Sequence, residues 1–419
     1  MRREFPKGFF WGASTSAHQV EGGTHNDWSE WEKENAKRLA ESAGVGTDVW
    51  KSWESRDRGR FPEMLEEANY ISGRAADHYN RFEKDFDIAK SLGHNAHRFS
   101  IEWSRIEPEE GKFDEKEIEH YRTVIAALRA RGMEPFVTLW HWPIPLWLEK
   151  KGGLESREFV SHFTRYTEKV VAALGADVVF WITLNEPEVV AGHAYLKGCW
   201  PPQKKSYSAY RRVIRNLIRA HKAAYTVIKE SHPEAKVCVA KHNIYFESAG
   251  GFINKALKWV ADRWWNDWFL NETKGYQDVI TLNHYHRNRI NYGFNEDHNE
   301  RISDMGWELH PESLAQMARE MHEKYKLPIY VTEHGLADAD DSHREWFITE
   351  SLKHLHHAIE EGVDVRGYLH WSLLDNFEWD KGFWPRFGLV AVDFKTQERK
   401  VRPSAQVYKK VCESNVLEL

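Results

Sequence analysis

The chain alternates short apolar runs with longer stretches in which apolar residues recur at helical spacing. Near-continuous apolar runs are typical of strands in a parallel sheet, because both faces of such a sheet are covered. A polar break follows each run before the helical pattern begins. The pattern predicts eight strands, over residues 9–14, 96–101, 135–140, 180–184, 236–245, 278–285, 328–335 and 365–371.

Helices are predicted between these strands, where apolar positions recur every three to four residues. The pattern places them over residues 77–92, 115–130, 156–174, 207–232, 257–270, 313–325 and 344–361. This alternation predicts an α/β fold, a (β/α)8 TIM barrel. We expect residues 1–419 to form a single catalytic domain, with a polar and weakly periodic surface insertion at about 35–73.

The ends of the predicted strands carry most of the residues with chemical capacity. In a (β/α)8 barrel the active site lies at the C-terminal ends of the strands, so these positions surround one cavity. Each residue alone is more simply explained as a satisfied polar group of the core, but their joint occurrence favours a site. The residues are Gln19, Arg98, His141, Asn185, Glu186, Asn283, Tyr285, Glu333 and Trp371.

The fourth run, FWITLNEPE over residues 180–188, ends abruptly in polar residues. Pro187 cannot continue a central strand, so the strand ends before it. A carboxylate at the end of a buried strand is poorly solvated, and burial raises the pKa of Glu186 in the direction that suits a proton donor. From this stretch alone, a Glu186 that closes the strand and faces water is an equally good interpretation.

Glu333 follows the seventh run and would face Glu186 across the barrel. Two opposed carboxylates are the minimum for cleavage of a glycosidic bond, since one protonates the leaving oxygen while the other attacks carbon or activates water. Both stereochemical outcomes stay open, because carboxyls about 5–5.5 Å apart give retention and about 6.5–9.5 Å inversion. Arg98, a charge inside an apolar run, needs a partner; it would suit the nucleophilic carboxylate or a structural ion pair.

Composition narrows the possible partners. The net charge is −6, so the chain has no basic excess with which to neutralise a nucleic acid. The 20 Trp residues are the outlier, and they suit both core packing and stacking on sugar rings. No run approaches the ~20 apolar residues of a membrane span, and the start of the chain lacks the apolar segment of a signal peptide.

The three cysteines, Cys199, Cys238 and Cys412, are far apart, which indicates neither a disulfide framework nor a metal site. A reducing compartment fits this pattern. We therefore expect a cytoplasmic protein without a membrane or nucleic-acid partner. The sequence is compatible with a monomer and with a homo-oligomer.

Several segments resemble glycoside hydrolase family 1, the β-glucosidase and β-glycosidase family. The resemblance implies a (β/α)8 barrel and a retaining double displacement through a covalent glycosyl-enzyme, without cofactor or metal. It implies a small-molecule substrate, a terminal non-reducing β-D-glucosyl residue and also galactosyl or fucosyl residues. The segments run nearly end to end: FFWGASTSAHQVEG, RFSIEWSRIEP, TLWHWPIPLWL, TLNEP, VTEHG, WSLLDNFEW and RFGLVAVDF.

The resemblance also implies roles for individual residues. Glu186 would be the acid/base and Glu333 the nucleophile, which Arg98, Asn283 and Tyr285 would orient. The sugar would be held by residues that donate to its hydroxyls or stack on its ring. These substrate-binding residues are Gln19, His141, Trp142, Asn185, Trp371, Glu378, Trp379 and Phe387.

Three positions depart from the family pattern. His334 stands where Asn usually follows the nucleophile, Pro143–Pro145 replaces Asp-Leu-Pro, and Ala391 replaces a common Tyr. The chain is also short for the family, so loops around the aglycone entrance are expected to be trimmed. Glu378 would repel a sugar 6-phosphate, which favours an unphosphorylated substrate.

Two other classes of protein are considered. His284 and His286 form an HxH pair that could belong to a metal-dependent barrel hydrolase, but no further ligand follows at a convincing spacing. A non-catalytic sugar-binding relative would be favoured by loss of either Glu186 or Glu333, and both are present. The Trp-rich stretch 252–269 would pack in the core or cover a pocket or a partner.

Overall fold

Eight parallel strands close into a barrel, which confirms the predicted fold. The computed structural model describes residues 2–43, 59–293 and 301–418. The strands follow one another around the barrel in chain order, and β11 closes it by pairing with β2. They are β2 (Phe10–Ser14), β3 (Ala96–Ser100), β4 (Glu134–Trp140), β5 (Phe180–Asn185), β6 (Lys236–His242), β8 (Ile280–Asn283), β10 (Ile329–His334) and β11 (Val365–Trp371).

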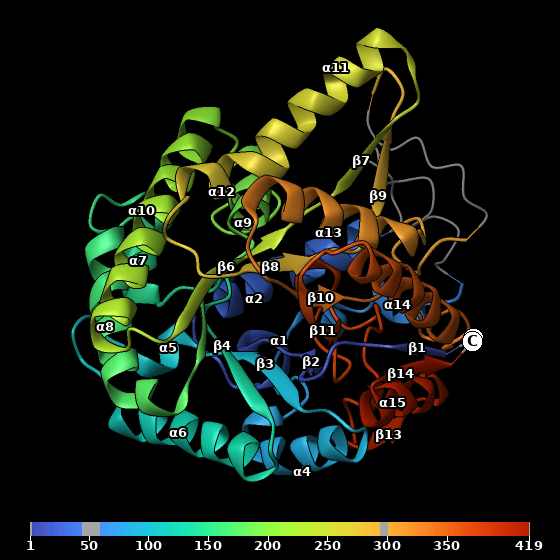
Figure 1. Ribbon diagram of the computed structural model, residues 1–419. Helices are drawn as coiled ribbons and strands as arrows, with labels where there is room; N and C mark the ends of the chain where they lie inside the picture. Colours follow the sequence, from blue (N-terminus) through green and yellow to red (C-terminus); the bar gives the residue numbers. More distant parts are fainter. Residues whose placement is uncertain (1, 44–58, 294–300, 419) are drawn as a thin grey trace.

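A ring of helices surrounds the barrel (Figure 1). Helix α10 illustrates why they form, because its buried side chains recur at helical spacing and the Ser206 hydroxyl caps its first turn by accepting from the Ala209 amide at 3.3 Å. The ring comprises α4 (His78–Ser91), α6 (Glu115–Ala130), α8 (Phe159–Leu174), α10 (Tyr207–Ser231), α13 (Glu312–Tyr325) and α14 (Arg344–Glu360).

An apolar plug fills the N-terminal end of the barrel interior. The rings of Phe136 and Phe180 stack with their centroids 4.1 Å apart, and Tyr330 and Phe10 pack against them. At the opposite end, Gly335 lets β10 pass close to β11, because a Cβ there would lie 1.9 Å from the Trp371 carbonyl oxygen. The N-terminal end of the barrel, called the lower end, is therefore closed by this plug. The polar residues of the predicted site lie at the C-terminal end of the strands, called the upper end.

The segment predicted as a surface insertion at about 35–73 is in part packed into the molecule. Residues 35–42 belong to α2 (Asp27–Ser42), which begins well before the predicted boundary. Phe61 is buried with its ring 5.1 Å from that of Trp384, and Tyr70 is buried as well. The sequence did not predict this packing because the few apolar residues that are buried are surrounded by polar ones. Residues 44–58 lie outside the described part of the chain.

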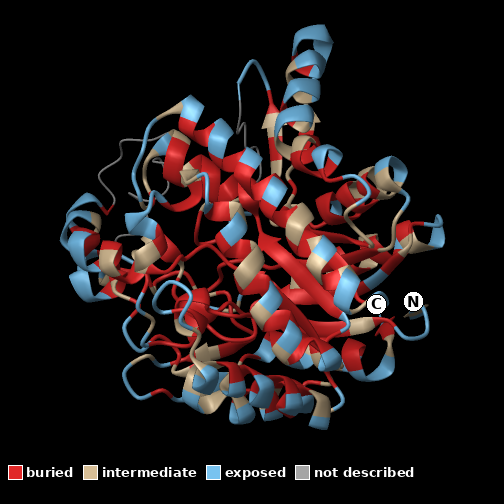
Figure 2. Cartoon of the chain, turned by 90° about the vertical axis from the view of Figure 1, so that its left-hand side faces the viewer, coloured by how far each residue is buried: buried red, intermediate tan, exposed pale blue. Residues whose placement is uncertain are grey.

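A projecting unit rises from the upper end of the barrel. Strands β7 (Tyr245–Ser248) and β9 (Arg287–Ile290) pair in parallel and follow β6 and β8 directly. The helix predicted at 257–270 begins earlier and has three parts, α11 (Gly251–Ala261), the π-helical η6 (Asp262–Asp267) and α12 (Trp268–Glu272). Gly250, with φ of 97°, turns the chain into α11. Helix α11 extends beyond the ring of helices (Figures 1 and 2).

Among the residues that the structure describes, no helix combines the length and the apolar character needed to cross a membrane. The three cysteines are free thiols.

Candidate active site

Glu186 and Glu333 lie at the upper ends of two barrel strands. Glu186 is the first residue after β5 and has a left-handed backbone with φ of 42°, directly before α9 (Pro187–Ala191). Its amide donates to the Ala240 carbonyl on β6 at 2.8 Å, which fixes the turn. Glu333 is the penultimate residue of β10. Both side chains are buried, with 5% and 3% of their residue surface exposed.

Glu333 is held by a cation and a hydroxyl. The Arg98 guanidinium donates to one carboxylate oxygen, and the Tyr285 hydroxyl donates to the other at 2.6 Å. Arg98 starts from the middle of β3, and it is aligned by bonds to Thr138 Oγ1 at 3.1 Å and Asn185 Oδ1 at 2.6 Å. Charge-assisted bonds of this kind stabilise the carboxylate and fix its orientation. Burial and the charges of both glutamates raise the pKa of Tyr285, so its hydroxyl stays a donor.

Glu186 is placed in a different environment. Its Oε1 accepts one hydrogen bond from Asn283 Nδ2 at 2.8 Å. Burial raises its pKa well above the ordinary value, and the negative charge of Glu333 raises it further. The Asn283 bond and the cations Arg98 and Lys241 oppose this rise. The raised pKa favours a protonated Glu186 beside the negative charge of Glu333.

Two amides connect the carboxyls to His141. Asn283 bridges Glu186 and Asn185, and its own Oδ1 accepts from Thr332 Oγ1 at 2.7 Å. Asn185 Nδ2 donates to His141 Nε2 at 3.0 Å, which assigns the proton of the neutral ring to Nδ1. Burial and the Arg98 charge lower the pKa of His141. Its Nδ1 has no hydrogen-bond partner within the described residues, so an N–H donor is available to a ligand.

A second polar pair completes the predicted sugar-binding end. Gln19 Nε2 donates to Glu378 Oε2 at 3.2 Å and to the Phe377 carbonyl at 2.9 Å, while Ser16 donates to Gln19 Oε1 at 2.6 Å. Burial, followed by the charges of Glu333 and Asp380, raises the pKa of Glu378 to about 8. A large fraction of this carboxyl is therefore protonated at neutral pH, and its repulsion of a phosphate is weaker than a fully ionised group would give.

Aromatic faces line the same end of the barrel. The His141 ring lies nearly parallel to Trp371 and Trp379, with centroids 6.2 and 6.0 Å away. Trp142 packs 4.5 Å from Trp379, and its Nε1 donates to the Asn185 carbonyl at 2.8 Å. Phe387 meets Tyr285 edge-on at 6.4 Å. Flat apolar faces beside polar edges match the two sides of a sugar ring.

The predicted site residues thus form a network around the two carboxyls, with the bonded pair Gln19 and Glu378 as a separate part of the site. Reasoning from sequence missed several supporting residues. Thr138 aligns Arg98, and Thr332 aligns Asn283. His18 binds Glu32 through a 2.6 Å contact and stacks on Trp379 with centroids 5.6 Å apart. Thr332 precedes Glu333 in the chain and His18 precedes Gln19, so adjacency was the only signal in the sequence.

His284, proposed above as a ligand in a metal-dependent barrel hydrolase, is already fully hydrogen-bonded within the protein. Both ring nitrogens of His284 are engaged, with the Asn243 carbonyl at 2.9 Å and the Ser313 hydroxyl at 2.7 Å. His286 lies beside Trp307 instead. No group of three or more metal-ligating side chains occurs in residues 2–43, 59–293 and 301–418.

The departures from the family pattern lie behind the site. His334 stacks on Phe347 at 4.8 Å and contacts the Tyr368 hydroxyl at 2.9 Å, so it belongs to the packing between β10 and α14. Ala391 lies in β12 (Val390–Val392) of a small two-stranded sheet outside the barrel. Ile144 of the Pro-Ile-Pro segment exchanges hydrogen bonds with Asp27 at the start of α2.

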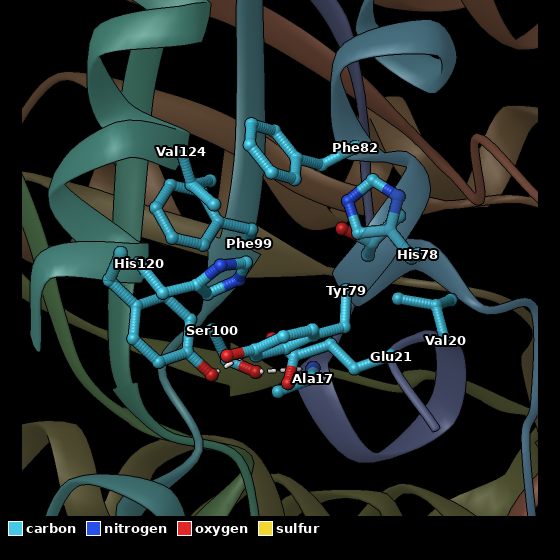
Figure 3. A pocket seen from close by; sticks show the side chains of 12 residues that line it. Ala17, Val20, Glu21, His78, Tyr79, Phe82, Phe99, Ser100, His120 and Val124 are labelled. Carbon is cyan, nitrogen blue, oxygen red and sulfur yellow. Dashed lines mark hydrogen bonds between the residues drawn. The ribbon is translucent and has the colours of Figure 1, made fainter. Parts of the chain in front are cut away.

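A small pocket outside the barrel wall is shown in Figure 3. It lies between α1 (Ala17–Val20), β3, α4 and α6, and two hydrogen bonds join residues of its lining. Tyr121 donates to Glu21 at 2.9 Å, and the Ala17 amide donates to Ser100 at 2.8 Å. Neither Glu186 nor Glu333 lines it, so it is separate from the two carboxyls.

Comparisons with known proteins agree with this geometry. The family model "Glycosyl hydrolase family 1" matches residues 1–274 and 275–417. Beta-glucosidase A of Thermotoga maritima is 32% identical, with 99% of each chain covered. A beta-galactosidase of Saccharolobus solfataricus is 30% identical over 99% of this chain and 96% of its own. The alignment with the T. maritima protein has 468 positions, so it contains gaps against this chain of 419 residues.

Solved structures give the same result. A beta-glycosidase from Pyrococcus horikoshii superposes with a TM-score of 0.87 at 35% identity, covering 100% of this chain and 97% of that one. The T. maritima beta-glucosidase in complex with deoxynojirimycin has a TM-score of 0.84 at 30% identity, covering 99% and 100%. The chain belongs to glycosyl hydrolase family 1, and it is a glycoside hydrolase.

Proposed function

We propose that the enzyme hydrolyses terminal non-reducing β-D-glucosyl residues of small glycosides and oligosaccharides with retention of configuration. One observation carries the proposal: two buried carboxyls share a network but have opposite surroundings. Glu333 is bound by Arg98 and Tyr285, whereas Glu186 has a raised pKa and a single amide donor. This asymmetry supports Glu333 as the nucleophile and Glu186 as the acid/base.

In the first step Glu333 attacks the anomeric carbon while Glu186 gives its proton to the glycosidic oxygen, which leaves as an alcohol. The product is an ester between the sugar and Glu333. Forming this ester removes the charge that raises the pKa of Glu186. Glu186 then acts as a base in the second step, taking a proton from water that attacks the same carbon and releases Glu333.

The sugar is assigned to the end of the network away from the leaving group. Gln19, His141, Asn185 and Glu378 would hold its hydroxyls, and the free Nδ1–H of His141 supports this assignment. Trp371 would form the stacking floor, flanked by Trp142, Trp379 and Phe387. Arg98, Asn283 and Tyr285 would orient the two carboxyls.

Galactosides and fucosides are proposed as further substrates. The names of relatives support the galactosides, since both beta-glucosidases and beta-galactosidases are similar over nearly the whole chain. We place the enzyme in the cytoplasm, where its three free thiols would stay reduced. A panel of nitrophenyl β-glycosides that includes 6-phospho forms ranks the sugars, and we expect the unphosphorylated glucoside to react fastest.

Azide rescue tests the two roles. Glu333→Ala removes the nucleophile, so turnover should be lost, and added azide should restore it by direct attack to give the α-glycosyl azide. In Glu186→Ala the ester still forms on an activated aryl glycoside, and azide should give the β-glycosyl azide. NMR of the products distinguishes the anomers. The same anomer from both variants would refute the assignment.

A further inference from the structure

The projecting unit, which we call the prong and define as residues 245–267 and 287–292, exposes large apolar side chains. Phe252 is 87% exposed and Tyr292 75% exposed at its tip. Trp259 and Val260 are 65% and 53% exposed along α11. Trp264 in η6 and Ile253 extend the same surface. Figure 2 shows α11 largely exposed, in contrast to the buried barrel strands.

This concentration is not found elsewhere on the described part of the molecule. The other large exposed apolar residues, Leu65, Val179, Tyr207 and Ile302, are far apart in the sequence. Tyr207 borders the prong, because the Tyr210 ring lies 6.1 Å from both Tyr207 and Trp264. An aromatic side chain has about 150–250 Å² of surface, so the four exposed aromatic residues of the prong present on the order of 500 Å². That lies toward the upper end of apolar patches on monomeric proteins, where such patches mark interaction sites.

The fold of the prong accounts for its inner face only. Phe246, Ala261 and Ile290 form a small core there, with Leu257 and Trp265 packed against it. Asn254 ties the tip together, since its side chain donates to the Gly250 carbonyl at 2.9 Å and accepts from the Tyr292 amide at 2.7 Å. None of these contacts uses the outer face. Trp264 also packs against the ring of helices, with its ring 6.1 Å from that of Tyr210 on α10, whereas Phe252, Trp259 and Val260 remain more than half exposed.

The exposed charged residues of α11 and η6 are both basic. Lys255 and Arg263 are exposed, and Arg263 lies over the Trp259 ring at 5.9 Å. The acidic residues of the prong are each paired with a cation: Asp262 with Lys258 at 2.6 Å, Asp267 with Lys324 at 2.9 Å and Glu247 with Arg287 at 2.6 Å. A second copy packed antiparallel on α11 would bring Lys255 against Arg263, which is repulsive. An anionic lipid surface complements both the cations and the Trp and Phe side chains.

The prong also lies at the catalytic end. Strand β7 follows β6 and β9 follows β8, and the last residues of β6 and β8 are His242 and Asn283. Asn283 is the residue that binds Glu186. A surface that receives the prong therefore lies on the side of the barrel on which the site opens.

We propose that the prong docks the enzyme on an anionic membrane surface, with α11 lying in the interface and the barrel mouth facing the lipid. Docking needs no membrane-spanning helix, so it is compatible with the absence of a spanning segment from the described residues. It does revise the expectation from the sequence that no membrane is involved. Apolar contact and basic attraction act together, as in interfacial amphipathic helices.

Co-sedimentation with vesicles tests the proposal. We expect the full-length enzyme to bind vesicles of phosphatidylcholine and phosphatidylglycerol at 7:3 more tightly than vesicles of phosphatidylcholine alone, and to be released by high salt. The triple variant Phe252→Ser/Trp259→Ser/Tyr292→Ser should bind at least about tenfold more weakly. Lys255→Gln/Arg263→Gln should lose about fivefold per charge on the anionic vesicles only.

The matched control is Val179→Ser, which removes an exposed apolar side chain directly before β5, at the plugged end of the barrel, and should bind like the parent protein. All variants should hydrolyse a nitrophenyl β-glucoside at the parental rate without vesicles, which separates docking from the proposed chemistry. Binding to neither vesicle, or equal loss in the control, would overturn the proposal. A dimer in sedimentation velocity that the triple variant dissociates would instead identify the prong as a self-association surface.

Discussion

At the scale of single residues, the coupling between Glu186 and Glu333 makes the clearest prediction. The Glu333 charge raises the pKa of Glu186, so Glu333→Gln should lower it. With Glu186 as the proposed acid, the alkaline limb of the parent pH–rate profile is expected to report loss of its proton. Carbon-13 NMR of labelled Glu186 should show it titrating at lower pH in Glu333→Gln. An unchanged titration would mean that burial alone holds the proton on Glu186.

Tyr285 permits a change that spares the packing. Tyr285→Phe removes the hydroxyl that donates to Glu333 at 2.6 Å but keeps the ring beside Trp307 and Phe387. Loss of one preorganised donor lowers kcat/KM by about 10²–10³-fold where charge changes in the transition state. Steady-state kinetics should show this loss with an unchanged melting temperature. The control Tyr207→Phe, at an exposed position, should have parental kinetics.

At the scale of elements, the strands and their ends were the most predictable features. Apolar runs identified all eight barrel strands, and residues predicted at their ends come together in the structure, because the fold fixes which ends meet. The extended reach of Arg98 from mid-strand was not predictable, since it depends on the alignment by Thr138 and Asn185. The position of α11 was also missed, because its start is set by Gly250 rather than by periodicity.

Side chains that act through other side chains left little trace in the sequence. His18, which stacks on Trp379, comes from α1, and its partner Glu32 lies on α2. The contact between His18 and Glu32 forms only when α2 folds over the end of the barrel, so the spacing of residues in the chain does not predict it. The same holds for Asp27, whose carboxylate accepts from the Ile144 amide at 2.8 Å in the segment after β4.

Asp27 gives a prediction about the attachment of α2. Burial raises its pKa from 3.8 to about 7, so the folded state disfavours its charge. Because the folded state then binds more protons than the unfolded state, Asp27 lowers stability as pH rises from about 4 to about 7. Asp27→Asn keeps the acceptor without the charge. Its stability relative to the parent should rise across this window, by up to about 4 kcal/mol.

Denaturant unfolding of both proteins at pH 4, 5.5, 7 and 8 measures this difference, since titrations elsewhere in the molecule cancel between them. The difference should level off above pH 7, where Asp27 is ionised in both states. A constant difference at every pH would indicate that Asp27 contributes through its hydrogen bonds and not through its charge.

At the scale of the whole molecule, the residues that pack the barrel interior and the two carboxyls lie at opposite ends of the barrel axis. The plug of Phe136, Phe180 and Tyr330 closes the lower end, and the carboxyls lie at the upper end. Phe180 is the first residue of β5 and Asn185 the last. At about 3.3 Å per residue their Cα atoms are roughly 16 Å apart, so the plug does not touch the reacting groups.

Phe180→Ala tests this separation. It removes a ring that stacks on Phe136 at 4.1 Å inside the barrel, and loss of a buried Phe costs about 3–5 kcal/mol of unfolding free energy. Below the lowered melting temperature, kcat/KM should stay within about twofold of the parent, because Asn185 and Glu186 are held by Arg98, His141 and Asn283. Val179→Ala, at a largely exposed neighbouring position, is the control and should change neither quantity. A large fall in kcat/KM with intact stability would contradict this prediction. It would show that packing at the lower end of the barrel determines the positions of the two carboxyls at the upper end.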